Sequence, residues 1–82
     1  MEVQRNLCYI FYVTRFGCGL KENERLSRSF IYNLEKNEKY WNNDKIIKTI
    51  DDLRKNSYKV NKIEFVEKRG IATKITHISV PL

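Results

Sequence analysis

The chain has 82 residues, of which 41% are hydrophobic and 32% are charged, a balance more typical of a folded protein than of a disordered one. This length leaves no room for a second core, so we expect one domain over residues 1–82. The net charge of +6 favours a polyanion or an acidic protein surface as the partner.

Two cysteines, Cys8 and Cys18, are too few for a disulfide framework or for two pairs of metal ligands. We therefore expect reduced thiols and a cytoplasmic protein. The apolar run at residues 7–13 is too short to span a membrane and no signal-peptide cleavage site follows it, so no membrane contact is expected.

Residues 7–16, LCYIFYVTRF, are rich in β-branched and aromatic side chains, and both alternating sets are largely apolar. This pattern predicts a strand that is buried on both faces and central in its sheet. Gly17 and Gly19 then end the apolar run, and a charged segment begins.

The glycine stretch FGCGL, residues 16–20, could in principle hold a phosphate or present Cys18 as a nucleophile. A dinucleotide-binding loop would need a third glycine where Glu22 stands. A nucleophilic Cys18 would depend on His77, the only histidine, and a lone histidine is more often structural. We find no catalytic constellation and no metal-ligand spacing, so we expect no enzyme and no cofactor. The stretch is interpreted as a corner between a strand and a helix.

Residues 21–37 are predicted to form the first helix, because apolar residues recur there at helical spacing. These residues are Leu26, Phe30, Ile31 and Leu34. The opposite side of this helix would carry a basic stripe of Lys21, Arg25, Arg28, Tyr32 and Lys36. The bases could follow a phosphate backbone, and Tyr32 could bond a phosphate or stack on a base. The alternative is an ordinary solvated helix face.

A second helix is predicted to begin at the capping residues Asn42 to Asp44 and to end near Asn56 and Ser57. Its buried residues would be Ile46, Ile47, Ile50 and Leu53. Trp41, in the preceding connection, is expected to fill the core.

Residues 58–80 are predicted to form a β-hairpin with the three-residue loop Lys68-Arg69-Gly70. In that register Phe65 faces Thr73 and Ile63 faces Ile75. The apolar positions change from odd to even numbers along both strands, which predicts either paired bulges or two halves that pack on different neighbours. The base of the hairpin is expected to join the strand at residues 7–16, and its tip to project.

These elements predict an α+β fold of order β-α-α-β-β, with a small three-stranded antiparallel sheet and two helices on one face. Residues 58–82 carry +3 of the net charge, and Lys68 and Arg69 stand at the hairpin tip. A basic β-ribbon can enter a groove of nucleic acid or follow its phosphates. The alternative is a soluble turn whose charges discourage edge aggregation.

The segment IIKTIDDLRKNSYKVNKIEF, with EKRG and ITHISV after it, resembles the end of winged-helix DNA-binding modules. Leu53, Lys55 and Tyr58 approximate the junction of helix and wing in that family. LKENERLSRSFIYNLEKN is similar to the first helix of such modules in small phage and mobile-element regulators. The resemblance implies a winged-helix-like C-terminal hairpin and duplex DNA as the ligand. The chain departs from the family by having room for one helix between the first helix and the wing.

The sequence therefore predicts a small, basic, non-enzymatic nucleic-acid-binding accessory or regulatory protein of phage or mobile-element type. Its expected binding residues are Lys21, Arg25, Arg28, Tyr32, Lys36, Lys68 and Arg69. The alternative is a protein-binding inhibitor or modulator of a host enzyme, similar to an anti-CRISPR protein. Exposure of Ile63, Phe65 and Ile75 would favour the alternative, and their burial would favour the wing.

Overall fold

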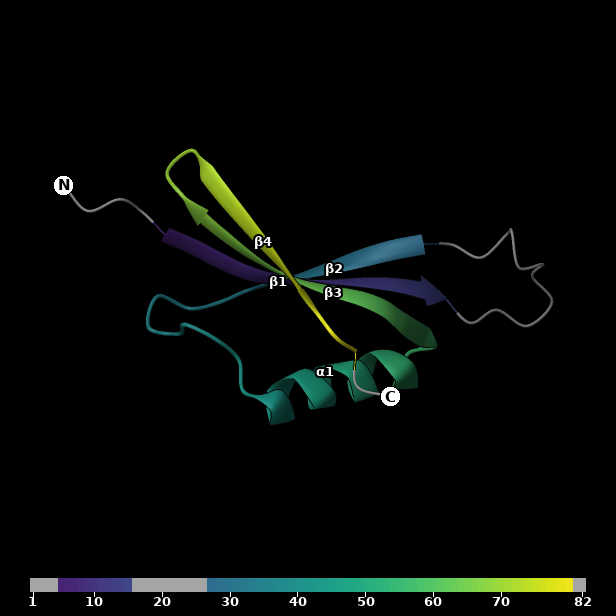
Figure 1. The fold of residues 1–82 in the computed structure, drawn as a ribbon. Helices are drawn as coiled ribbons and strands as arrows, with labels where there is room; N and C mark the ends of the chain where they lie inside the picture. Colours follow the sequence, from purple (N-terminus) through teal and green to yellow (C-terminus); the bar gives the residue numbers. More distant parts are fainter. Residues whose placement is uncertain (1–4, 16–26, 81–82) are drawn as a thin grey trace.

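The structure, a computed structural model, describes residues 5–15 and 27–80. These residues form four strands and one helix: β1 (Arg5–Arg15), β2 (Ser27–Asn33), α1 (Asn43–Lys55), β3 (Tyr58–Arg69) and β4 (Ala72–Ile78). The strands make one antiparallel sheet in the order β2-β1-β3-β4. Helix α1 lies along one side of this twisted sheet (Figure 1).

The prediction of a three-stranded sheet with two helices on one face is wrong. Residues 27–33, assigned to the first helix by their spacing, form strand β2 and pair with β1. Phe30 and Tyr32 alternate along β2 opposite Phe11 and Tyr9, so the apolar residues fit a period of two as well as a helical one. The glycine corner and residues 21–26 lie outside the described residues.

Strand β1 is central in the sheet, as predicted, but the prediction that it is buried on both faces is wrong. Its odd-numbered side chains make the core with helix α1, and its even-numbered residues 8–14 are half-buried. Tyr9 and Phe11 are buried, and the ring of Trp41 stacks on Tyr9 with 5.0 Å between ring centroids. The backbone N–H of Trp41 donates a hydrogen bond to the Tyr9 hydroxyl at 3.4 Å. The predicted core position of Trp41 is therefore confirmed.

Helix α1 begins where the capping residues predicted it. The side-chain oxygen of Asn42 accepts a hydrogen bond from the Lys45 backbone N–H at 2.8 Å, which satisfies a free donor of the first turn. The buried helix residues are Ile46, Ile50 and Leu53. Ile47 is 43% exposed, so its predicted burial is wrong. Ser57, with φ of 69°, then turns the chain into β3.

The hairpin register differs from the predicted one. Arg69 pairs with Ala72, which leaves Gly70 and Ile71 as a two-residue loop. Gly70 has φ of 62°, the conformation that a type II′ turn requires at its first loop position. Ile63 consequently pairs with Ile78 instead of Ile75, and Ile75 lies on the opposite face of the sheet from Ile63.

A single bulge accounts for the change of parity along β3, whereas along β4 the change arises because Ile75 lies on the face away from the core. Lys62 pairs with Tyr12 and Val60 pairs with Val13, so Asn61 is the extra residue between them. The side-chain amide of Asn61 donates a hydrogen bond to the Thr14 hydroxyl. The register of β4 is continuous, and β3 pairs with β1 from its base to its tip.

Candidate interaction surface

The expected basic stripe is only partly within the described residues. Lys21 and Arg25 lie outside the described residues, whereas Arg28 and Tyr32 lie on β2, on the face towards α1. The ring of Tyr32 packs edge-on against Phe11, 5.3 Å between centroids. Burial, with a smaller contribution from Asp52, raises the pKa of Tyr32. Tyr32 therefore belongs to the edge of the core.

Arg28 also turns towards other side chains on this face. Its guanidinium lies 4.8 Å from the centre of the Phe30 ring and donates a hydrogen bond to the Tyr58 hydroxyl at 3.4 Å. Such a cation–π contact holds the guanidinium over the aromatic edge of the sheet.

The other three predicted residues lie near one end of the sheet. Lys36 follows β2 and Lys68 lies near the end of β3, and both line one groove. Arg69 is the last residue of β3, beside the hairpin loop. The fold thus brings together basic residues that are distant in the sequence.

The face of the sheet that points away from α1, called here the open face, has no element over it among the described residues. Figure 1 shows α1 on the other side only. Polar side chains are normal on the solvated face of an antiparallel sheet. Here five small or aliphatic residues cross all four strands instead. This apolar strip consists of Ile31, Ile10, Cys8, Val66 and Ile75.

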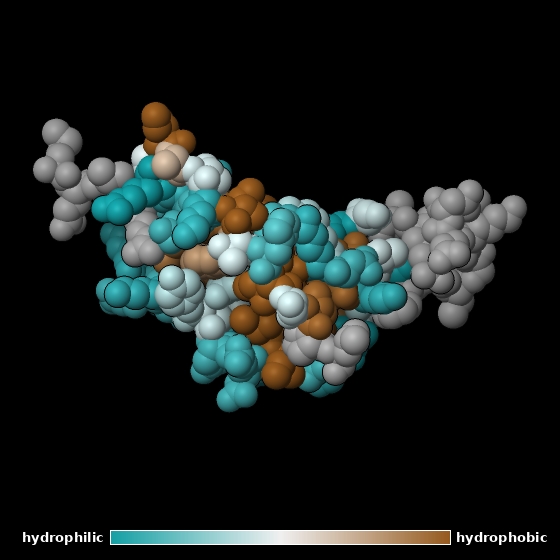
Figure 2. Space-filling model, in the orientation of Figure 1, coloured by the Kyte–Doolittle hydropathy of each residue, from teal (hydrophilic) through white to brown (hydrophobic). Residues whose placement is uncertain are grey.

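Cross-strand pairs make the apolar strip continuous. Ile10 is paired with Ile31, and Val66 is paired with both Cys8 and Ile75. At its two ends the strip is open to solvent, because Ile31 is 60% exposed and Ile75 is 52% exposed. Figure 2, in the orientation of Figure 1, shows apolar surface between the sheet and the helix and at the hairpin loop, among hydrophilic side chains.

An ion pair lies beside the apolar strip on the open face. The Glu64 carboxylate is almost fully buried, and the Lys62 Nζ lies 2.7 Å from its Oε1. This hydrogen bond raises the pKa of Lys62. His77 Nδ1 is 3.9 Å from the same oxygen, and Lys62 Nζ lies 5.3 Å from the centre of the Tyr12 ring. Glu64, the one acid of this face among the described strand residues, is thus already matched by a neighbouring base.

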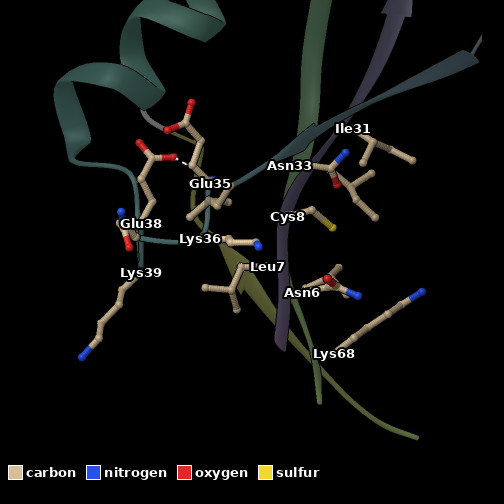
Figure 3. Close-up of a pocket in the computed structure, with 14 residues that line it drawn as sticks. Asn6, Leu7, Cys8, Ile31, Asn33, Glu35, Lys36, Glu38, Lys39 and Lys68 are labelled. Atoms are coloured by element: carbon tan, nitrogen blue, oxygen red, sulfur yellow. Dashed lines mark hydrogen bonds between the residues drawn. The ribbon is translucent and has the colours of Figure 1, made fainter. Parts of the chain in front are cut away.

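A groove with a volume of about 990 Å³ occupies the end of the open face where β2 stops. Its apolar side is formed by Cys8, Ile10, Ile31 and Val66, and its wall by residues 34–39. Figure 3 shows Lys36 extending from this wall towards Cys8, and Lys68 on the same side as Cys8 and Asn6.

Of the two acids of the groove wall, Glu38 is paired, whereas the Glu35 carboxylate makes no ion pair within the described residues. Glu38 contacts the Lys45 Nζ at 3.5 Å and accepts a hydrogen bond from the Glu35 backbone N–H. Lys36, Lys39 and Lys68, called here the groove lysines, make no ion pair within the described residues. The groove therefore combines an apolar floor with an excess of unpaired positive charge, three lysines against Glu35.

Cys8 brings a thiol to this groove, and the surroundings disfavour its ionised form. Burial raises the pKa of Cys8, and Lys68 opposes this with a smaller effect. The thiol is therefore protonated at neutral pH and adds an uncharged, weakly polar surface to the groove. No cluster of three metal-ligating side chains occurs within residues 5–15 and 27–80.

No family model, curated protein or solved structure matches this chain. The only helix of the described residues, α1, has 13 residues, and no helix there is long and apolar enough to cross a membrane.

Sequence reasoning missed the apolar strip. The signal was present in SFIYNL, where Phe30, Tyr32 and Leu34 alternate with Ser29, Ile31 and Asn33. A strand assignment there would have put Ile31 on the face opposite the core. The position of Ile75 required the correct hairpin register.

Proposed function

We propose that the protein is a non-enzymatic binding module that docks the open face of its sheet on an acidic protein partner. The observation that carries the proposal is the apolar strip with its exposed ends, Ile31 and Ile75, next to the unpaired groove lysines. An apolar centre with a polar rim is the usual composition of a protein interface. Small inhibitors and modulators of enzymes act through such surfaces, and this class of protein is the one proposed here. The proposal also includes a cytoplasmic location.

The side chains of the open face fit a protein better than a nucleic acid. Surfaces that bind single strands offer aromatic rings on which bases stack. Among the described residues, Tyr12 is the one Phe, Tyr or Trp on the open face, and Lys62 already lies over its ring. Ile75 is exposed as the protein-binding hypothesis expected, whereas Ile63 and Phe65 are buried as the wing hypothesis expected.

Nucleic-acid binding, with duplex DNA as the ligand, is the second candidate. Its support is the basic end of the sheet, where Lys68 and Arg69 flank the hairpin loop and Lys36 lines the adjacent groove. The register also places Arg5 opposite Arg69. A regulatory role of phage or mobile-element type and the winged-helix resemblance remain predictions attached to this candidate.

Affinity purification from nuclease-treated lysate of the source cells tests the first proposal. Three baits would be compared: the wild-type protein, an Ile31→Asp/Ile75→Asp variant, and an Ile47→Asp control. The control places an aspartate at an exposed isoleucine of helix α1, away from the open face. We expect an acidic protein to be retained by the wild type and the control and lost by the open-face variant. Equal retention on all three baits would contradict docking through the open face.

A fluorescence polarisation titration with duplex and single-stranded DNA tests the second candidate. At about 50 mM salt even non-specific binding is detectable. Binding that Lys68→Ala/Arg69→Ala loses and Ile31→Asp/Ile75→Asp keeps would support the nucleic-acid candidate. No binding to either DNA would remove it and leave the protein partner.

A further inference from the structure

Strand β4 is an edge strand whose outer side pairs with none of the described residues. Residues 72–77 are all exposed, and the register of β4 with β3 is continuous. Edge strands are usually protected by bulges, prolines or several charges, because their free N–H and C=O groups can pair with another strand. Within β4 the only residue of the Lys, Arg, Asp and Glu types is Lys74.

We propose that β4 pairs antiparallel with β4 of a second copy of this chain, about a two-fold axis at Ile75. The two sheets would then join into one sheet of eight strands. In this register Ile75 faces the partner's Ile75, Lys74 faces the partner's Thr76, Thr73 faces the partner's His77, and Ala72 faces the partner's Ile78.

The proposed register agrees with the side chains of β4. No two groups of like charge lie directly opposite each other, and isoleucine faces isoleucine at the centre, where cross-strand apolar contacts stabilise the pair. Since the apolar strip ends at Ile75, the strips of the two copies would meet at the axis. The pairing uses the edge of the sheet and leaves most of the open face free. Ile75 belongs to both surfaces, whereas Ile31 and the groove lysines belong to the open face alone, so variants at those positions separate association from the proposed function.

Sedimentation velocity over a range of protein concentrations tests the association. We expect the mass to rise from that of the 9.9 kDa chain towards twice that value. The rise should be steeper at high salt, because screening weakens the repulsion between two chains of charge +6. Ile75→Lys would put two ammonium groups face to face and weaken association by tenfold or more, on the order of 1.4 kcal/mol.

Ile31→Lys is the matched control, because it makes the same change at the far edge of the sheet. This variant should associate like the wild type. Loss of association in Ile31→Lys would instead indicate contact through the open face or through β2 and would overturn the proposal. A wild-type chain that stays monomeric up to about 0.5 mM would also overturn it, since pairing that weak has no role at cellular concentrations.

Disulfide formation tests the register. In a Cys8→Ser/Cys18→Ser background, oxidation of Ile75→Cys should give a covalent dimer, because directly opposed Cα atoms lie about 4.5–5.5 Å apart. Thr73→Cys on the same face should remain monomeric, because its two copies would be offset by four residues, roughly 13 Å. Crosslinking of Thr73→Cys in preference to Ile75→Cys would contradict the proposed axis.

Discussion

At the scale of single residues, the reactivity of Cys8 reports directly on the groove. Burial raises the pKa of its thiol, so we expect alkylation by iodoacetamide in a Cys18→Ser variant to reach half its maximal rate at a higher pH in the folded chain than in denaturant. The pKa of Cys8 is higher in the folded chain than in the unfolded chain. The protonated thiol therefore contributes its full share to the free energy of unfolding below the unfolded pKa, and this contribution is lost as pH rises through the folded pKa.

The control for this measurement is Lys68→Ala. Because Lys68 lowers the pKa of Cys8, its removal should move the alkylation midpoint to still higher pH. A folded midpoint below the denatured one would show that the groove activates the thiol, which would contradict the burial argument.

Residue types alone predicted the core better than the surface. Tyr9, Phe11, Tyr12 and Trp41 were expected in the core. Tyr9, Phe11 and Trp41 are buried there, as expected of large aromatic side chains in a small domain, whereas Tyr12 lies half-buried on the open face, so its predicted core position is wrong. Tyr32 was assigned to a binding stripe because its residue type does not say which face it occupies. Its pairing with Tyr9 across β1 and β2 puts it at the core edge.

At the scale of elements, the start of helix α1 was predictable because its signal is local. The Asn42 side chain bonds the backbone N–H of Lys45, so Asn42→Ala should lower the free energy of unfolding by about 1 kcal/mol. Asn43→Ala, an exposed position one residue later, should have little effect. Urea unfolding would show this as a lower midpoint with an unchanged slope. Equal midpoints for the two variants would contradict the capping role.

Strand β2 and the hairpin register were not predictable in the same way, because their signals depend on distant partners. Phe30, Ile31 and Leu34 satisfy a helical period, but the same segment also alternates between apolar residues on two faces. It forms a strand because β2 hydrogen-bonds along β1. In the hairpin, Lys68-Arg69-Gly70 fits a three-residue loop by composition. The pairing of Ile63 with Ile78 over the core decides the register instead.

At the scale of the whole molecule, helix α1 covers one face of the four-stranded sheet of the described residues and so defines two different surfaces. The face under α1 holds the core, and the open face holds the apolar strip and the groove lysines. The sequence alone implied two helices on one face, so it could not locate this second surface. Its existence depends on β2 being a strand, which places Ile31 beside Ile10.

The distribution of charge over the whole molecule gives a further prediction. A chain of net charge +6 is destabilised by self-repulsion, so its free energy of unfolding should rise between about 10 mM and about 1 M NaCl, as the Debye length falls from about 30 Å to about 3 Å. Replacing the three groove lysines with glutamine gives a net charge of 6 − 3 = +3 and should flatten this dependence.

The matched control replaces Lys45, Lys48 and Lys55 of α1 with glutamine and reaches the same net charge of +3. These lysines share their helix with Asp44, Asp51 and Asp52, and Lys45 also contacts Glu38. Their loss should therefore flatten the salt dependence less than loss of the groove lysines. Equal flattening in both triple variants would show that only total charge matters. The groove would then carry no concentrated positive potential, and the argument for an acidic partner would lose its electrostatic basis.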